Sequence, residues 1–239
     1  MAATAIHRCP KCGTYFEPAR ALASECPECG IWFNKWGVDP VHVDIVPVLA
    51  ESGALDDVDS PDPFTYYGRV ALLAFVAIWG LRLAATDYRG EELMSSFMHA
   101  ILLPIHEAGH VLFRLFGELM TVAGGSLFQV LLPFAIGVAF VVKQRDPFGA
   151  AMCLWWTGAS LVDLSAYIWD ALHPQLILLG GQTGEEGGHD WIYLLGRFGS
   201  LQNAHGWGKT AHHLGVLMMV GGVVWGASWL WARRPGKAA

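Results

Sequence analysis

Charged residues are scarce in this chain. Asp, Glu, Lys and Arg together make up 15% of its 239 residues, whereas hydrophobic residues make up 54% and eleven residues are tryptophan. The mean hydropathy is +0.38. An ordinary soluble domain has about a quarter of its residues charged, so this composition excludes that class. It predicts instead a polytopic protein of the lipid bilayer, built as an all-α helical bundle, because helices satisfy their own backbone groups in lipid.

Basic runs and an apolar N-terminal leader are missing too. The net charge is −6, and the 15 Lys and Arg residues are scattered rather than grouped with aromatic residues. Nucleic-acid binding needs clustered basic residues, so we expect no nucleic-acid partner. Residues 1–30 have no apolar stretch like that of a signal peptide and hold cysteine pairs instead. We therefore expect insertion to start at an internal segment, with the preceding residues left in the compartment of synthesis.

Apolar segments of the right length suggest about five membrane spans. They cover residues 68–85, 93–117, 121–142, 148–172 and 209–232. Between Leu172 and Lys209 two apolar pieces, LILLGG and WIYLLG, are each too short to cross, which favours a re-entrant or interfacial loop. Five spans starting from the cytosol would place Arg233 and Arg234 outside, against the positive-inside tendency. Because of this conflict, the number of spans could be one more or one fewer than five.

Cysteine is infrequent, but its spacing is informative. Four of the five cysteines form two C-x2-C pairs, each followed directly by glycine: Cys9 with Cys12, and Cys26 with Cys29. Four thiolates in such pairs hold one tetrahedral zinc, and glycine permits the tight turns. The pattern resembles the zinc-ribbon family, which implies a closed structural site. Two disulfides are the alternative, but short pairs fit them poorly. We therefore expect residues 1–34 to form a zinc ribbon. Because its thiols must be reduced to bind zinc, we expect it to lie in the cytosol. The fifth cysteine, Cys153, is predicted to be a core residue.

One apolar segment carries a motif of ionisable residues. The pentad HEAGH occupies residues 106–110 within the segment 93–117. Helix positions i and i+4 share a face, so His106 and His110 can reach one zinc, and Glu107 beside them can take a proton from an attacking water. Each ionisable group at this depth costs about 3 kcal/mol, which a bound metal would offset. The alternative is a buried helix whose histidines are satisfied by neighbouring hydroxyl groups.

A catalytic zinc needs a third protein ligand. The segment 148–172 offers Asp163 and Asp170 on one polar stripe, and the connection after it offers His189. We expect Asp170 to be the ligand, with His189 second, because Asp170 lies at the helix end beside the loop that carries His189. Asp190 would orient a ligand histidine or, alternatively, cap a short helix.

A glycine-rich polar patch follows the pentad. Gly124 and Gly125 permit close backbone approach, and Ser126 and Gln129 add polar groups to the same segment. The patch could hold a substrate strand or donate hydrogen bonds to an oxyanion. A seam of small residues that packs two helices together explains the glycines equally well.

The pentad in a span, the polar patch after it and an aspartate on a later span resemble the site-2 protease family of intramembrane metalloproteases. The resemblance covers residues 93–172 and implies that His106 and His110 bind zinc, that Glu107 is the general base and that an aspartate on the later helix is the third ligand. Residues 66–234 would then form a membrane-embedded zinc metallopeptidase domain that acts on a membrane protein or peptide, joined to the ribbon by a linker or interfacial segment, residues 35–65.

Two other functions remain open. The histidines outside the pentad are numerous enough for a di-metal membrane oxidase or desaturase, although HGWGKTAHH lacks the tight spacing of histidine boxes. A non-catalytic adaptor is the other possibility, in which a membrane anchor carries a zinc ribbon that binds a protein partner. Zinc at two sites, one structural and one catalytic, favours the hydrolase, whereas iron favours the oxidase.

Overall fold

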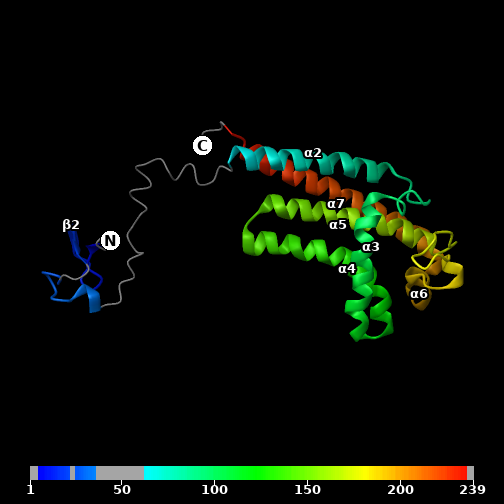
Figure 1. Cartoon of the computed structure of the whole chain (residues 1–239), viewed down its shortest axis with the longest axis horizontal. Helices are drawn as coiled ribbons and strands as arrows, with labels where there is room; N and C mark the ends of the chain where they lie inside the picture. The colour runs from blue at the N-terminus through cyan, green and yellow to red at the C-terminus, as the bar shows by residue number, and fades with distance from the viewer. Residues whose placement is uncertain (1–4, 22–24, 36–61, 236–239) are drawn as a thin grey trace. The chain divides into compact units, whose positions relative to one another are not determined.

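The computed structural model describes residues 5–21, 25–35 and 62–235 (Figure 1). Contacts within the chain separate two compact units, residues 1–60 and 61–238. Each unit is described by itself. The predicted linker, residues 35–65, lies almost entirely outside the described residues.

The N-terminal unit is a small metal-ribbon arrangement. Strands β1 (Ala5–Arg8) and β2 (Tyr15–Ala21) pair antiparallel, and the 3-10 turn η1 (Phe33–Lys35) closes the described part. Its apolar core is little more than Ile31 and the edge-to-face pair Phe16 and Phe33, whose ring centroids are 5.8 Å apart. So few buried side chains do not stabilise an independent fold, and units of this size usually depend on a metal or a disulfide.

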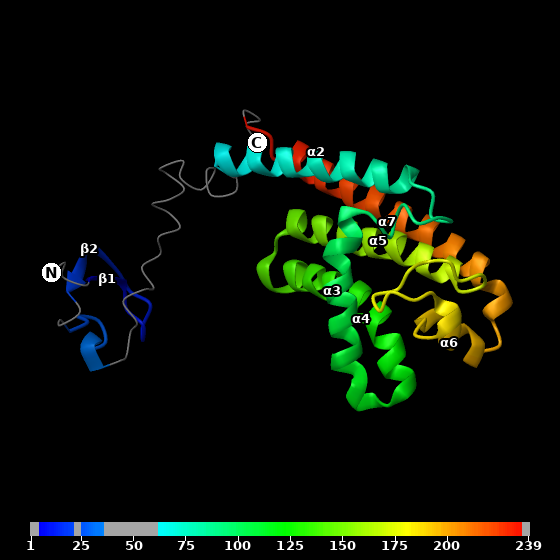
Figure 2. The ribbon, with the colours of Figure 1, turned by 45° about the vertical axis from the view of Figure 1, so that its right-hand side comes forward.

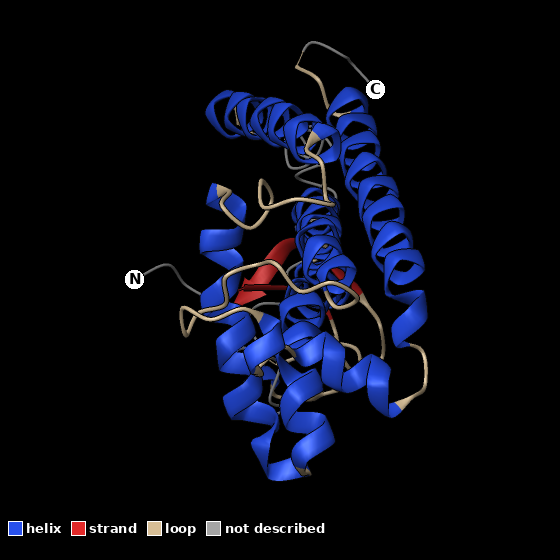
Figure 3. Cartoon of the chain, turned by 90° about the vertical axis from the view of Figure 1, so that its right-hand side faces the viewer, coloured by secondary structure: helices blue, strands red, loops and turns tan. Residues whose placement is uncertain are grey.

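The regular structure of the second unit is helical in the described residues, as the composition predicts, and strands occur only in the ribbon (Figure 3). Its six α-helices are α2 (Pro63–Ala85), α3 (Phe97–Phe113), α4 (Glu118–Ala139), α5 (Pro147–Asp170), α6 (Asp190–Arg197) and α7 (Ala204–Ala232). Short turns join them: η2 (Arg114–Phe116), η3 (Phe140–Gln144), η4 (Gly184–Glu186) and η5 (Leu201–Asn203).

Two of the long helices begin with the same device. The carboxylate of Asp62 accepts a hydrogen bond from the backbone N–H of Phe64 at 2.8 Å, and Pro63 is the first residue of α2. Asp146 precedes Pro147 in the same way at the start of α5. An aspartate cap satisfies N–H groups that have no partner within the helix, and proline is tolerated at the first helical position.

Three described helices, rather than about five, are long and apolar enough to cross a membrane. They cover Pro63–Ala85, Glu118–Gln144 and Leu201–Ala232. The predicted span 93–117 is broken, because α3 has 17 residues and Gly117, at φ 90°, turns the chain after η2. The predicted span 148–172 does form the 24-residue helix α5, but Asp163 and Asp170 lower its hydropathy and most of its residues are buried within the bundle.

Helix α5 is the centre of this bundle. It packs most extensively against α7 and also contacts α4 and α2 (Figures 1 and 2). Glycines permit the close approach of α5 and α7: a Cβ atom on Gly158 would lie 2.5 Å from the carbonyl oxygen of Gly215. Small residues at such crossings bring two backbones into van der Waals contact, the packing that apolar bundles use.

One end of the bundle gathers the start of α2, the start of α5 and the end of α7. The guanidinium of Arg69 pairs with Asp146 at 3.1 Å and lies over the rings of Phe148 and Trp229, at 5.2 and 4.8 Å. The start of α2 and the end of α7 therefore lie together. A five-span arrangement would put them at opposite ends, so this contact does not agree with that expectation.

Candidate functional site

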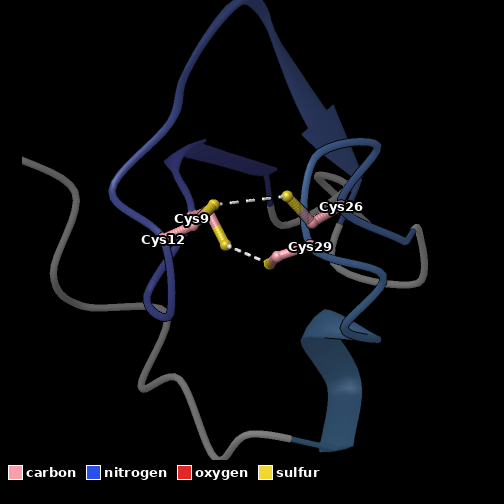
Figure 4. Close-up of side chains that lie close together, drawn as sticks. All are labelled: Cys9, Cys12, Cys26 and Cys29. Atoms are coloured by element: carbon pink, nitrogen blue, oxygen red, sulfur yellow. Dashed lines mark hydrogen bonds between the residues drawn. The ribbon is translucent and has the colours of Figure 1, made fainter.

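The four paired cysteines converge in the ribbon (Figure 4). The Sγ atoms of Cys9 and Cys29 are 3.6 Å apart, and those of Cys12 and Cys26 are 3.8 Å apart. A tetrahedron with Zn–S bonds of about 2.3 Å has edges of about 3.8 Å, whereas a disulfide bond is about 2.05 Å long. All five cysteines of the chain are free. The spacing therefore fits one zinc held by four thiolates better than it fits two disulfides.

Local hydrogen bonds shape both cysteine pairs in the same way. The backbone N–H of Gly13 donates to the carbonyl of Cys9 at 3.0 Å, and that of Gly30 donates to the carbonyl of Cys26 at 2.9 Å. Both glycines have positive φ, 77° and 69°, which residues with a Cβ rarely adopt. The predicted role of glycine in these turns is confirmed.

Cys12 is the outermost of the four thiols. Hydrogen bonding to the side chain and the backbone of Thr14 lowers the pKa of the Cys12 thiol from 9.0 to about 6. The Sγ atom lies 3.1 Å from the hydroxyl oxygen of Thr14. Thiolates rather than thiols bind metal, so this environment supplies one ligand in its metal-binding form at neutral pH.

In the helical unit, the pentad meets a residue from a distant part of the chain. His106 and His110 lie on α3 with ring centroids 4.8 Å apart, as the i, i+4 spacing predicts. Their Nε2 atoms are 3.0 and 3.3 Å from one oxygen, Oδ2 of Asp190, which is the first residue of α6. Ligands about 2.05 Å from a tetrahedral zinc are separated by about 3.3 Å. The two histidine nitrogens therefore lie at about this distance from the Asp190 oxygen, and all three atoms lie within 4.8 Å of one another, so the group could hold a metal ion.

The other nitrogen of His106 is held by a buried amide. Nδ1 of His106 donates to Oε1 of Gln129 at 2.9 Å, and Nε2 of Gln129 donates to the carboxylate of Asp163 at 2.9 Å. Asp163 also accepts from Nδ1 of His99 at 3.1 Å. Because a carboxylate only accepts, Asp163 fixes the orientation of the amide, and the amide fixes the tautomer of His106. Nε2 of His106 lies at hydrogen-bonding distance, 3.0 Å, from Oδ2 of Asp190 and is the nitrogen that a metal would bind.

His110 is oriented by the backbone. Its Nδ1 donates to the carbonyl oxygen of Thr121 on α4 at 2.8 Å, which again leaves Nε2 as the ligand atom. Gly125 provides the space for both ligand nitrogens, since a Cβ atom there would collide with Nε2 of His106 and lie 2.6 Å from Nε2 of His110. The neighbouring Gly124 packs against α3 instead. Gly124 therefore fits the interpretation of a packing seam, whereas the substrate-binding interpretation of the patch stays a prediction.

Glu107 shares a cavity with these ligands. The cavity has a volume of about 670 Å³, and its lining includes Glu107, His110, Tyr167, Asp190 and residues of the loop 177–182. In the described part of the chain no hydrogen bond or ion pair engages the Glu107 carboxylate. It is free to accept a proton from a molecule in the cavity, the property that a general base needs.

Asp170 and His189, the ligands expected from the sequence, are not brought to the pentad. Nε2 of His189 lies 3.3 Å from Oδ2 of Asp170, so the two pair with each other. Asp163 supports Gln129 instead. In the helical unit, as far as it is described, the ligand-type atoms that cluster come from His106, His110 and Asp190. The cap of α6 is also reassigned, because His189 rather than Asp190 accepts from the N–H of Ile192.

No spacing rule links Asp190 to the pentad, because α4 and α5 lie between them in the chain. The one local signal is its place beside His189, at the start of a short helix after two glycines. Comparisons of the chain with models of protein families, with curated proteins and with solved structures found no match. What the protein does is therefore inferred from its own residues.

The glycine at 125 gives a first prediction. Gly125→Ala should weaken zinc binding by the bundle by at least 10-fold, because the new methyl group occupies the place of the two Nε2 atoms. Zinc affinity is measured by competition with a chelator. Gly206→Ala on α7 is the matched control, since a Cβ there meets nothing within 4 Å. Unchanged affinity in the Gly125→Ala protein would mean that zinc is not held at these nitrogens.

Proposed function

We propose that this protein is a membrane-embedded zinc-dependent hydrolase, and specifically a metallopeptidase that cleaves membrane proteins or peptides. The observation that carries the proposal is the convergence of His106, His110 and Asp190 beside Glu107 in one cavity. Two histidines and one carboxylate that leave a fourth position open are a ligand set of catalytic zinc sites, whereas structural sites are closed.

The chemistry divides between metal and protein. When bound, zinc supplies Lewis acidity that polarises a carbonyl and makes water more acidic. Glu107 takes a proton from the attacking water and later returns it to the leaving amine. Gln129 and the Thr121 carbonyl keep both imidazoles in the tautomer that presents Nε2. Tyr167 accepts a hydrogen bond from the backbone N–H of Asp190 at 3.0 Å and so helps to hold that carboxylate in place.

The peptide substrate follows from the resemblance to the site-2 protease family stated above. The cavity volume of about 670 Å³ falls within the range of about 300–1,000 Å³ that is usual for ligand-binding sites, which is compatible with a short stretch of substrate. Three helices with the length and composition of membrane spans support a site beside or within a bilayer. With the starts of α2 and α5 and the end of α7 at one face, we infer that the ribbon and the end of α7 share a compartment, the cytosol.

The alternative functions have less support. A di-metal oxidase needs a second set of ligands, yet His205 stacks on Trp169 at 3.9 Å and His212 stacks on Tyr88 at 4.4 Å. Neither histidine belongs to a metal-type cluster in the described residues. Burying the amide of Gln129 costs free energy, and a protein that served only as a membrane anchor would not need an amide that fixes the tautomer of His106. A protein partner for the ribbon is compatible with the hydrolase and remains part of the proposal.

Metal content tests the proposal. Purified protein in detergent should contain about two zinc ions per chain, one in each unit. Cys12→Ser should remove the ribbon zinc and leave the bundle zinc, because the ribbon is built from contiguous sequence. Cys153→Ser is the matched control, since Cys153 is buried in α5 and belongs to neither cluster. Elemental analysis gives the counts. Two irons per chain, with zinc confined to the ribbon, would overturn the hydrolase in favour of the oxidase.

A further inference from the structure

A single buried carboxylate holds both ends of the connection between α5 and α6. Oδ1 of Asp170 accepts from the backbone N–H groups of Gln175 and Leu176, at 2.8 and 3.2 Å, where this connection begins. Oδ2 of the same residue faces Nε2 of His189, where the connection ends. Asp170 is 7% exposed and His189 is 4% exposed. These contacts are thus shielded from water, which strengthens electrostatic attraction.

The position of the His189 side chain restricts the position of Asp190, the next residue in the chain. Its Nδ1 accepts from the N–H of Ile192, so Nε2 is the ring nitrogen that faces Oδ2 of Asp170, at 3.3 Å and without a hydrogen bond between the two atoms. Its ring packs on the ring of Tyr167 at 4.2 Å, and the hydroxyl of Tyr167 accepts from the backbone N–H of Asp190. The residue before Asp190 and the backbone N–H of Asp190 itself are therefore both in contact with side chains of α5.

We propose that Asp170 and His189 are positioning residues that hold Asp190 in reach of the metal bound by His106 and His110. This inference rests on the proposed function, since it assigns the pair to the same site. If the loop were free, Asp190 would become ordered only when metal binds. The conformational entropy lost in that step would weaken the affinity for the metal. A loop tied at both ends presents the carboxylate already in place. The two residues that the sequence offered as ligands thus act on the metal through the ligand next to them.

The test is the zinc affinity of the bundle in variants that break the pair. Asp170→Asn keeps an oxygen for Gln175 and Leu176 but turns an amide group toward His189. His189→Asn keeps a good helix cap but is too short to reach Asp170. Each should raise the zinc dissociation constant of the bundle about 10- to 100-fold, the usual effect of losing a partner of a metal ligand. The ribbon zinc should be unchanged in both, which makes it an internal reference.

The double variant Asp170→Asn/His189→Asn separates a pair from two independent residues. If the two act through one contact, the double variant should bind zinc about as weakly as the weaker single variant. Losses that multiply would overturn the inference, and so would single variants that bind within twofold of wild type. Asp87→Asn is the matched control, because Asp87 is exposed and pairs only with Arg89 among the described residues.

A glycine variant tests the same contact if the charge variants unfold the bundle, which circular dichroism would reveal. A Cβ atom on Gly184 would lie 2.7 Å from Cδ2 of His189, so Gly184→Ala should displace that ring and weaken zinc binding by about 10-fold. Gly90→Ala, with nothing within 4 Å, is its control. Wild-type affinity in Gly184→Ala overturns the inference. A wild-type bundle that binds no zinc overturns the proposed function itself, so the two failures are distinguishable.

Discussion

Glu107→Gln is expected to abolish turnover and to leave both zinc ions in place. Glutamine keeps the shape of the side chain but cannot take a proton from water, and loss of a general base costs about 10²–10⁴ in rate. Zinc should stay because Glu107 is not one of the converging ligand groups. A membrane substrate co-expressed with the wild-type protein should be cleaved, and the same substrate beside the variant should remain intact.

Glu118→Gln is the matched control for this experiment. Glu118 is the first residue of α4 and is exposed, so its substitution should leave cleavage at the wild-type rate. Equal cleavage by the wild-type and Glu107→Gln proteins would remove Glu107 from the mechanism and point to a contaminating protease. Loss of bundle zinc in the variant would show instead that Glu107 is a metal ligand, and the assignment of roles within the pentad would have to change.

Asp190→Ala is expected to have the largest effect on metal binding. It takes away one of three protein ligands, and two histidines alone leave the site with too few ligands for a stable tetrahedral zinc. We expect the dissociation constant of the bundle zinc to rise by more than about 100-fold, beyond the 10- to 100-fold effect of losing a supporting residue. Zinc content after dialysis against a weak chelator provides the measurement, with the ribbon zinc as the reference.

Asp163→Ala is the comparison that gives this result its meaning. Asp163 supports Gln129 rather than facing the Nε2 atoms, so its loss should weaken zinc binding less than the loss of Asp190. If Asp163→Ala weakened zinc binding more than Asp190→Ala, Asp163 would be the third ligand. Asp190 would then only form ion pairs with protonated histidines. Equal and undiminished zinc in both variants would mean that the third ligand is neither of these aspartates.

Two features of the candidate sites follow from short stretches of sequence. The cysteine cluster follows because each C-x2-C pair, with its glycine, closes a turn by hydrogen bonds within a few residues. The shared face of His106 and His110 follows because helical periodicity alone places i and i+4 together. In both cases the atoms that must meet are joined by a short length of chain whose conformation is local.

The span count and the third ligand did not follow from sequence, and the reasons differ. Hydropathy cannot distinguish a helix exposed to lipid from a helix such as α5 that is buried by its neighbours. Hydropathy also does not show that the chain turns at Gly117, where the helical segment that follows α3 ends. Asp163, Asp170 and Asp190 offer the same carboxylate, so chemistry could not choose among them. The choice depends on where the loop after α5 returns.

The sequence by itself determined that this protein has a ribbon with four cysteines, an apolar helical unit, and a helix that presents two histidines and a glutamate. The tertiary structure alone decided which carboxylate meets those histidines. Helix α5 uses Asp163 to hold Gln129 and Asp170 to hold the following loop, and Asp190 is the carboxylate left facing both Nε2 atoms. The physical reason is that contacts between distant segments depend on packing and hydrogen bonds across the bundle, which no local spacing encodes.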